Sequence, residues 1–270
     1  MARKWGQHFL TDPRVADRIV NFLAPKKDEV VLEIGPGRGV LTERLVSRCK
    51  KVIGVEIDPE LAKGLERKGW KNFKLVKKDI LDTLPSEVGD VDVVIGNLPY
   101  EISAPLTFDL LNWDFDRAVL MYQKEFAEKM VAEVGDDEYG RLSVTVAYKA
   151  DVEFLEKVPP SAFAPPPRVD SAVVRMLPRE TPPFPVKNEA FFLALVQALF
   201  GQRRKTIRRA LQNQKEAIGL DGTEPALIDE LLAEEEYDSA RPEELSPGEL
   251  AELSNRLFTK FKPKVPGAAR

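Results

Sequence analysis

The sequence has one cysteine, one histidine and no long hydrophobic run, and these shortages exclude several classes of protein. Cys49 has no partner for an internal disulfide, and the chain does not open with the charged and then apolar segments of a secretory leader. No stretch approaches the roughly 20 uninterrupted apolar residues of a membrane-spanning helix. We therefore expect a soluble, cytoplasmic protein that has no membrane partner.

Positive charge is not in excess either. Forty Lys and Arg against 44 Asp and Glu give a net charge of −4, which argues against a surface that binds nucleic acid uniformly. A polyanionic partner must therefore meet a local patch. Residues 1–27 hold six basic against two acidic side chains, and residues 202–211 hold five basic and no acidic ones. The five are Arg203, Arg204, Lys205, Arg208 and Arg209.

The second basic segment has the spacing of an amphipathic helix. That spacing places Arg204 and Arg208 on one face, with Ile207 and Leu211 toward the core. Residues 216–252 then hold thirteen acids against Arg241 alone, so charge is segregated along the chain. We predict that the five basic residues bind RNA phosphates; a solvated helix face is the alternative.

The hydrophobic pattern predicts two domains and a tail. Five apolar runs, which alternate with helix-period stretches, are typical of parallel strands that are buried on both faces: 29–34, 51–57, 73–76, 91–95 and 118–122. Residues 1–179 are thus predicted to form a doubly wound α/β domain, with 142–147 and 171–177 as an antiparallel hairpin at the sheet edge. Four helical stretches predict an all-helical domain at 180–262, and 263–270 reads as a disordered basic tail.

Chemistry-bearing residues follow the first two of these strands. Glu-Ile-Gly-Pro-Gly-Arg-Gly at 33–39 contains Gly35 and Gly37, which let the backbone pass close to a ligand. Its G-x-G-x-G spacing fits neither a dinucleotide fingerprint nor a phosphate loop, and a turn without a ligand is the alternative. Glu56, at the end of the next strand, can accept two ribose hydroxyls. Its alternative is a helix-capping role, for which Asp58 before Pro59 is the better candidate.

Two further strand ends complete the pattern. Asp79 can accept from an adenine amino group, or it simply forms a turn. Asn97-Leu98-Pro99-Tyr100 suits a planar amine, whose conjugated lone pair attacks poorly unless acceptors hold its N–H groups. The Asn97 side-chain oxygen and the Pro99 carbonyl are such acceptors, and Tyr100 can stack on the base. The alternative is an Asn-Pro turn with a surface tyrosine.

In this order, the motifs resemble those of S-adenosylmethionine-dependent adenine-amino methyltransferases, which have a Rossmann-like fold. Gly6-Gln7-His8-Phe9-Leu10 and the proline-rich segment 158–172 extend the resemblance to the ribosomal RNA small-subunit adenine dimethyltransferases, over residues 3 to about 210. His8 favours the archaeal and eukaryotic branch. The resemblance implies an enzyme that dimethylates two adjacent adenosines in a hairpin loop near the 3′ end of small-subunit ribosomal RNA. The sulfonium donor calls for no metal. We expect a monomer that acts on an assembling small subunit, although the sequence leaves both the oligomeric state and the choice between naked RNA and a particle open.

The resemblance also assigns roles to residues. The cofactor S-adenosylmethionine would be bound by Gln7, His8, Leu10, Gly35, Gly37, Glu56, Ile57, Asp79, Ile80 and Asn97. Asn97, Leu98, Pro99 and Tyr100 would form the catalytic motif, and Phe163 would close the stack opposite Tyr100. A hydrophobic plug is the alternative for Phe163. We interpret His8 as a packing and cofactor-loop residue rather than a general base, because an aryl amine loses its proton easily after methylation.

Three other functions compete with this interpretation. A large-subunit ribosomal RNA adenine methyltransferase of the antibiotic-resistance type shares most of the motifs, but the acidic chain and His8 disfavour it. A non-catalytic RNA-binding or ribosome assembly factor is a second possibility, which the intact Asn97–Tyr100 motif disfavours. Methylation of a protein glutamine amide uses a similar tetrapeptide, with Pro in place of Leu98, and has no need of a basic segment.

Overall fold

The computed structural model describes residues 8–234, 237 and 239–264. The chain divides into two compact units. The first consists of Met1–Glu128 and Ala150–Pro178, and the second of Lys129–Lys149 and Arg179–Arg270. Within the described residues, no helix combines the length and the apolar character that crossing a membrane requires.

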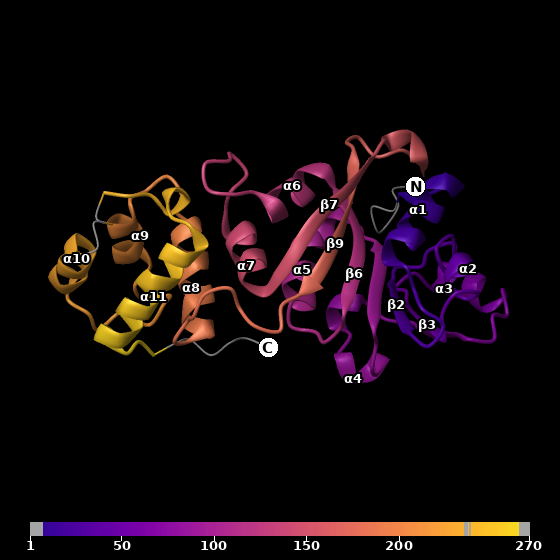
Figure 1. The fold of residues 1–270 in the computed structure, drawn as a ribbon, viewed down its shortest axis with the longest axis horizontal. Coiled ribbons are helices and arrows are strands. Elements are labelled where there is room, and N and C mark those ends of the chain that lie inside the picture. Colours follow the sequence, from indigo (N-terminus) through magenta and orange to yellow (C-terminus); the bar gives the residue numbers. More distant parts are fainter. Residues whose placement is uncertain (1–7, 235–236, 238, 265–270) are drawn as a thin grey trace. The chain divides into compact units, whose positions relative to one another are not determined.

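The first unit is built on a seven-stranded sheet of order β4-β3-β2-β5-β6-β9-β7 (Figure 1). The first five strands of this order run parallel, and β9 is antiparallel to both of its neighbours. The bounds are β2 Val30–Ile34, β3 Lys51–Val55, β4 Phe73–Val76, β5 Val93–Asn97, β6 Arg117–Gln123, β7 Ala150–Val158 and β9 Ser171–Pro178. The chain runs outward from β2 to β4 and then returns to pair β5 with β2. Such a switch point is where open α/β sheets bind ligands, at the carboxyl ends of the strands.

Helices cover both faces of this sheet. Helix α1 (Pro13–Leu23) starts at Asp12, whose carboxylate accepts a hydrogen bond from the Arg14 amide at 2.9 Å. Its buried side packs with α2 (Thr42–Leu45) on one face. On the other face, Thr107 of α5 (Ser103–Leu110) lies 2.9 Å from the Tyr122 hydroxyl of β6. Because both faces are covered, the strands read as uninterrupted apolar runs, and the predicted doubly wound α/β fold is confirmed.

Shorter elements connect the strands of this unit. They comprise helices α3 Pro59–Glu66 and α4 Pro85–Val88, and the small strands β1 Phe9–Leu10 and β8 Phe163–Ala164. Helix α6 (Lys124–Val131) begins in this unit and ends in the second. Strands β1 and β8 pair with each other in antiparallel fashion. This pairing joins the chain just before α1 to the proline-rich segment, across more than 150 residues of sequence.

The predicted strand at 142–147 is wrong, because these residues lie in helix α7 (Arg141–Lys149). Val144 and Tyr148 are one helical turn apart and both are buried in the core of the second unit, so the apolar run serves a helix. The antiparallel edge hairpin is instead formed by β7 and β9. Charged residues such as Asp151 and Glu153 alternate along β7, as an edge strand allows, and this alternation hid the strand from a search for apolar runs.

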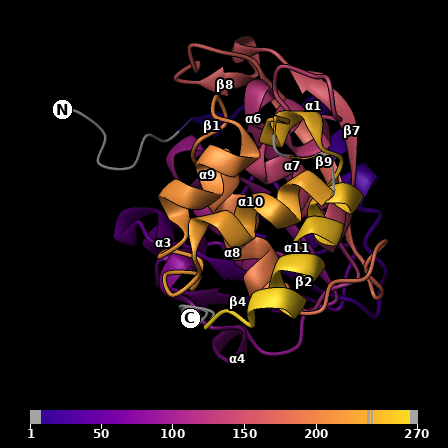
Figure 2. The ribbon, with the colours of Figure 1, turned by 90° about the vertical axis from the view of Figure 1, so that its left-hand side faces the viewer.

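The second unit is helical (Figure 2). Besides α7 it contains α8 Glu189–Phe200, α9 Ile207–Gln214, α10 Pro225–Glu234 and α11 Pro247–Phe261. The start of α11 has a capping box, in which the Ser246 hydroxyl accepts from the Glu249 amide and the Glu249 carboxylate accepts from the Ser246 amide. The core is formed by apolar side chains of α7 to α11, with Phe191 and Phe192 fully buried.

The observed units differ from the predicted domains in one segment. The chain enters the second unit after Pro178, one residue from the expected boundary, but residues 129–149 also belong to this unit. The reason is packing: the Tyr148 ring lies 5.2 Å from that of Phe192, and the Tyr139 hydroxyl donates to the Leu245 carbonyl at 2.8 Å. Of the predicted disordered tail 263–270, Pro263 is buried, and residues 265–270 lie outside the described residues.

Candidate active site

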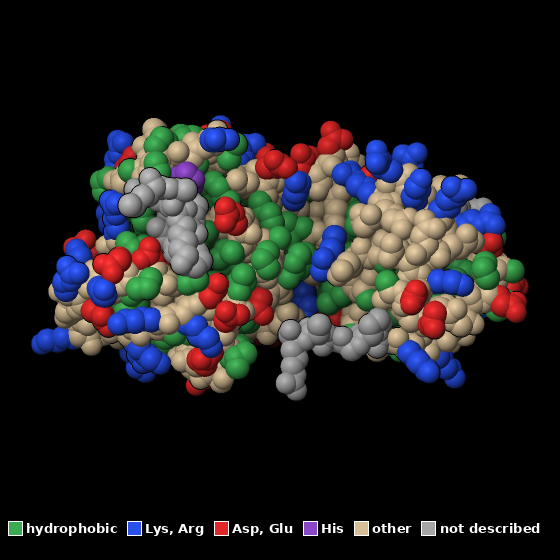
Figure 3. Space-filling model, turned by 180° about the vertical axis from the view of Figure 1, so that it is seen from behind, with side chains coloured by type: hydrophobic (Ala, Val, Ile, Leu, Met, Phe, Trp, Pro, Cys, Tyr) green, Lys and Arg blue, Asp and Glu red, His purple; other side chains and the backbone are tan. Residues whose placement is uncertain are grey.

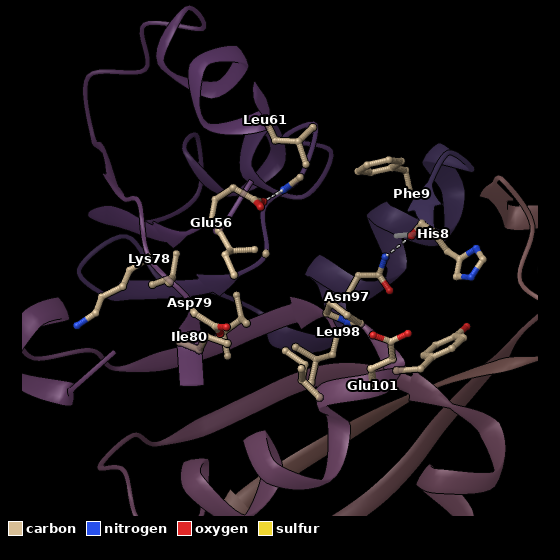
Figure 4. A pocket seen from close by; sticks show the side chains of 18 residues that line it. His8, Phe9, Glu56, Leu61, Lys78, Asp79, Ile80, Asn97, Leu98 and Glu101 are labelled. Atoms are coloured by element: carbon tan, nitrogen blue, oxygen red, sulfur yellow. Dashed lines mark hydrogen bonds between the residues drawn. The ribbon is translucent and has the colours of Figure 1, made fainter. Parts of the chain in front are cut away.

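A cavity of about 300 Å³ lies at the carboxyl ends of the parallel strands in the first unit (Figure 4). Residues that follow β2, β3, β4 and β5 line it, and His8 and Phe9 lie at its side. The cavity therefore occupies the switch point between β2 and β5. In the space-filling view, the purple side chain of His8 marks this region on the first unit, and hydrophobic side chains lie beside it (Figure 3).

Glu56 is held rigidly at the end of β3. Its Oε2 accepts a hydrogen bond from the Gly37 amide and its Oε1 one from the Asp58 amide, each at 2.9 Å. The side chain is 3% exposed, and burial raises its pKa even though both hydrogen bonds act in the opposite direction. Asp58 caps α3 by accepting from the Glu60 amide at 2.8 Å. The capping role that we weighed for Glu56 thus belongs to Asp58.

The glycine loop approaches both the cavity and Phe9. Gly35 and Gly37 have φ of 64° and 59°, a region that side chains rarely adopt. A Cβ on Gly37 would lie 3.4 Å from the Phe9 ring, and the Arg38 guanidinium lies 4.5 Å from the centre of that ring. The loop therefore leaves little space between its backbone and the segment that precedes α1.

Glu33 lies beneath this loop. The Thr42 hydroxyl donates a hydrogen bond to its Oε2 at 2.6 Å. The side chain is buried, and burial raises the pKa of Glu33 to about 7, with the nearby charge of Glu56 acting in the same direction. Glu33 thus links the end of β2 to the start of α2 on the other side of the loop.

Asp79 serves as a turn residue and also faces the cavity. Its Oδ1 accepts from the Leu81 amide at 3.0 Å, and its carbonyl accepts from the Thr83 hydroxyl at 2.6 Å. The turn interpretation of Asp79 is thus confirmed, and its role toward an adenine amino group stays a prediction. Its neighbour Lys78 also lines the cavity, and its ammonium group lies 2.8 Å from the Glu87 carboxylate.

The Asn97–Tyr100 motif is fixed through its backbone and its side chains. The Asn97 Nδ2 donates to the His8 carbonyl at 3.0 Å, so the side-chain Oδ1 is the acceptor end that remains. The Leu98 amide donates to the Met121 carbonyl at 3.1 Å. The Pro99 carbonyl accepts from the Ile102 amide at 3.2 Å, which occupies one of its two lone pairs.

The ring of Tyr100 is held at the cavity by contacts on two sides. Its hydroxyl lies 2.7 Å from the Ser171 hydroxyl, and its ring centre lies 5.8 Å from that of His8. Burial raises the pKa of Tyr100, so the phenol stays protonated. The His8 Nδ1 lies 2.9 Å from the Pro165 carbonyl, which ties the loop before β9 to the same side of the cavity.

Phe163 does not lie in the cavity, which differs from the expected position opposite Tyr100. Its side chain is 4% exposed and belongs to the hydrophobic core, because the pairing of β8 with β1 turns it inward beside Leu10. This position matches the alternative of a hydrophobic plug. A stacking role requires the ring to leave the core.

The structure brings most of the predicted site residues together. Those that line the cavity are His8, Gly35, Gly37, Glu56, Ile57, Asp79, Ile80, Asn97, Leu98, Pro99 and Tyr100. Leu10 lines a smaller neighbouring cavity, and Gln7 lies outside the described residues. Sequence reasoning missed the other lining residues, which are Phe9, Ile34, Val55, Leu61, Lys78, Glu101 and Ile102. Apart from Leu61, each of them lies within two positions of a predicted site residue.

The basic segment differs from the predicted helix face. Helix α9 begins at Ile207 after its N-cap Thr206, so Arg204 and Lys205 lie in the turn that precedes it. Arg208 pairs with Asp229, with Nε 2.8 Å from Oδ1. Ile207 and Leu211 are buried as predicted.

The five basic residues fall into two groups. Arg203 pairs with Glu243, as Arg208 does with Asp229. Arg204, Lys205 and Arg209 are exposed and form no ion pair with the described part of the chain. Figure 3 shows Lys and Arg side chains gathered along the upper side of the second unit, drawn at the right.

The other basic patch, at 1–27, is largely neutralised where it is described. Arg14 pairs with Asp12 at 3.1 Å, Arg18 with Glu156, and Lys26 with Glu29 at 3.7 Å. The segment is therefore less basic in the folded chain than its composition suggests.

The cavity fits an adenosine-containing ligand. Glu56 offers an immobilised carboxylate for vicinal hydroxyls, and Asp79 offers an acceptor for an amino group, with apolar Ile57 and Ile80 next to them. The glycine loop, the acidic residues that follow β3 and β4, and the parallel sheet occur together in the first unit. In combination they define a Rossmann-like methyltransferase that uses S-adenosylmethionine.

Comparison with known proteins identifies the family. The sequence profile described as "Ribosomal RNA adenine dimethylase" matches residues 1–235, and the chain belongs to this family. It is 43% identical over 259 residues to the "Probable ribosomal RNA small subunit methyltransferase A" of Methanococcoides burtonii, covering 93% of this chain and 92% of the relative. It is 42% identical over 255 residues to the protein of the same name from Methanopyrus kandleri, covering 93% and 90%.

Two solved structures are similar over nearly the whole chain. A dimethyladenosine transferase from Plasmodium falciparum matches with a TM-score of 0.78 and 30% identity, over 95% of this chain and 99% of the other. The 23S rRNA methyltransferase ErmE matches with a TM-score of 0.67 and 29% identity, over 92% and 99%. The predicted family, fold class and cofactor are thereby confirmed.

Proposed function

We propose that this protein transfers methyl groups from S-adenosylmethionine to the exocyclic amines of two adjacent adenosines in a hairpin loop near the 3′ end of small-subunit ribosomal RNA. One observation carries the proposal: the Asn97–Tyr100 motif faces the same cavity as Glu56 and Asp79. An acceptor for a target amine thus lies beside a site for an adenosine-containing donor. The names of the archaeal relatives support the small subunit as the substrate.

The chain's own residues hold the two reactants. Glu56 accepts from the ribose hydroxyls of the donor, and Asp79 accepts from its adenine amino group. The sulfonium centre of S-adenosylmethionine supplies an electrophilic methyl group and leaves as a neutral thioether. Because these groups are positioned before the reaction, catalysis rests on proximity and electrostatics rather than on a protein nucleophile.

Asn97 activates the target amine. With its Nδ2 committed to the His8 carbonyl, its Oδ1 can accept an N–H of the adenine amine, and the second lone pair of the Pro99 carbonyl can accept the other. These bonds draw electron density toward the nitrogen as it pyramidalises. The ring of Tyr100, held by Ser171, offers a face on which the flipped-out base can stack.

RNA binding would use the exposed cations of the second unit. Arg204, Lys205 and Arg209 are free of ion pairs with the described residues, so each can neutralise a phosphate without breaking an internal contact. Arg203 and Arg208 are bound to acids and contribute less. The substrate we favour is an assembling small subunit, in which the 3′ hairpin is still accessible.

The test uses radiolabelled S-adenosylmethionine with undermethylated small ribosomal subunits and, separately, with large subunits, followed by nucleoside analysis. We expect labelled dimethyladenosine in small-subunit RNA alone. Label confined to large subunits would favour the activity in the name of ErmE, whose fold is similar. Absence of label in both, despite cofactor binding measured by calorimetry, would contradict the proposal and favour a non-catalytic assembly role.

A further inference from the structure

The cavity carries an uneven charge. Among the described residues that line it, three carry carboxylates, Glu56, Asp79 and Glu101, and Lys78 alone carries an ammonium group. Lys78 is neutralised by Glu87, whose two carboxylate oxygens lie 2.9 and 2.8 Å from Nζ. The electrostatic potential that these side chains create in the cavity is therefore negative, which favours a cationic ligand.

The three carboxylates are not equivalent. Both oxygens of Glu56 accept backbone amides, and Oδ1 of Asp79 accepts the Leu81 amide. Glu101 has neither a hydrogen bond nor an ion pair from its side chain to any described residue. Its negative charge is thus the one of the three that the described part of the chain leaves uncompensated.

Glu101 also differs in position. It lies in the short 3₁₀ turn Tyr100–Ile102, directly after the Asn97–Tyr100 motif. Figure 4 shows its carboxylate on the side of the cavity where Asn97 lies, with Glu56 and Asp79 on the opposite side. The uncompensated charge therefore lies at the end of the cavity where the target amine would be held, away from the end that suits ribose and adenine.

We propose that the Glu101 carboxylate makes this cavity prefer the cationic methyl donor over the neutral product that remains after transfer. The inference rests on the proposed function, since it assumes a sulfonium donor. In that reaction the amine lone pair forms the N–C bond, the C–S bond breaks with its electron pair remaining on sulfur, and the nitrogen releases a proton to water. The positive charge thus leaves sulfur, and attraction to Glu101 is lost with it.

Glu101 therefore affects which of the two ligands binds more tightly, and not only how tightly the donor binds. A carboxylate near the sulfur lowers the free energy of the bound sulfonium but does little for a thioether of almost the same shape. The donor can then displace the product from the cavity, which repeated transfer to one amine requires. Because Glu101 is exposed, solvent and salt must screen the effect in part.

The test measures the dissociation constants of S-adenosylmethionine and S-adenosylhomocysteine by calorimetry, for the wild-type chain and for Glu101→Gln. We expect the constant for the donor to rise about three- to tenfold and that for the product to change less than about twofold. The effect of Glu101→Gln on the dissociation constant of the donor should shrink as salt is raised from low to high concentration. Glu101→Lys should enlarge the loss for the donor.

Glu43→Gln is the matched control. Glu43 is an exposed glutamate of α2 that does not line the cavity, so its loss removes the same charge from the same unit and should leave both constants unchanged. Equal weakening of both ligands by Glu101→Gln, or no change in either, would overturn the inference while the proposed function stands. Failure of the wild-type chain to bind either ligand would instead overturn the proposed function itself.

Discussion

Two buried carboxylates lie under and beside the glycine loop, Glu33 at the end of β2 and Glu56 at the end of β3. Burial raises the pKa of both, and a neighbouring negative charge acts in the same direction, that of Glu56 on Glu33 and that of Asp58 on Glu56. Glu56 retains two backbone hydrogen bonds as compensation, whereas Glu33 has the hydroxyl of Thr42. An ionised Glu33 therefore costs stability, since desolvation outweighs its single side-chain hydrogen bond.

Because ionising Glu33 is unfavourable in the fold, we expect the free energy of unfolding to depend on pH. The ordinary pKa of a glutamate is 4.5, and that of Glu33 in the fold is about 7. Between these values the folded chain binds more protons than the unfolded chain, so the Glu33 contribution to stability falls as the pH rises through this window. Glu33→Gln should thus match the wild type near pH 5 and exceed it near pH 8, as measured by urea denaturation. A difference that does not change with pH would contradict the raised pKa, and Glu43→Gln is the control.

Asn97 makes the sharpest prediction for catalysis. Asn97→Ala removes the acceptor for the target amine, so methyl transfer should fall about 100-fold or more, as for loss of a transition-state hydrogen bond. The thermal midpoint should change little, because the residue is only half-buried. Asn112→Ala is the control, since the Asn112 side chain also donates to a carbonyl, that of Phe108 at 2.9 Å, but outside the cavity. Near-normal turnover of Asn97→Ala would contradict the proposed role of Asn97 as the acceptor for the target amine.

At the scale of elements, the pattern of hydrophobic residues predicted the parallel strands well, and β4 was predicted at its observed bounds. It failed for α7, because Val, Thr and Tyr in a run favour a strand locally while Val144 and Tyr148 pack as helical neighbours in the second unit. Tertiary contacts, which lie far away in the sequence, thus overrode local propensity. The start of α9 was missed for a different, local reason: its N-cap Thr206 lies inside the basic run, and the basic residues before it were assigned to the helix.

The ion pairs of Arg203 and Arg208 change which cations should bind RNA. Neutralising Arg204, Lys205 and Arg209 together to Gln should weaken RNA binding and reduce the slope of log K against log salt by about 2 to 3, at 0.7–0.9 per phosphate contact. Arg208→Gln is the comparison, because Arg208 joins α9 to Asp229 of α10. This variant should lower the thermal midpoint and leave the salt slope nearly unchanged. An unaltered slope in the triple variant would mean that these residues form only a solvated surface.

At the scale of the whole molecule, the cavity and the exposed cations of the basic segment belong to different units. The described residues that line the cavity lie between positions 8 and 102, within the first unit, whereas the exposed cations of the basic segment lie in the second. The acids of 216–252 belong to the second unit as well. The segregation of charge along the sequence is therefore largely an internal property of this unit, where Asp229 and Glu243 compensate two of its arginines.

This division predicts a local response to the cofactor. S-adenosylhomocysteine at 100 times its dissociation constant should stabilise the first unit by about 2.7 kcal/mol. Hydrogen exchange should accordingly slow at the strand ends around Gly37, Glu56, Asp79 and Asn97, with no change in α8 to α11. Adenosine alone, which lacks the amino-acid part, is the control and should protect fewer of these amides. Slower exchange throughout α8 to α11 would show that the units respond together.

The sequence by itself determined the α/β order of the first unit and the residues of its cavity. Gly35, Glu56, Asp79 and Asn97 each lie at or just after the carboxyl end of a parallel strand, and these ends meet at one edge of the sheet. Tertiary structure alone decided the burial of Phe163, the transfer of residues 129–149 to the second unit and the pairing of individual cations. These features depend on contacts between residues far apart in the chain, and no local pattern encodes such contacts.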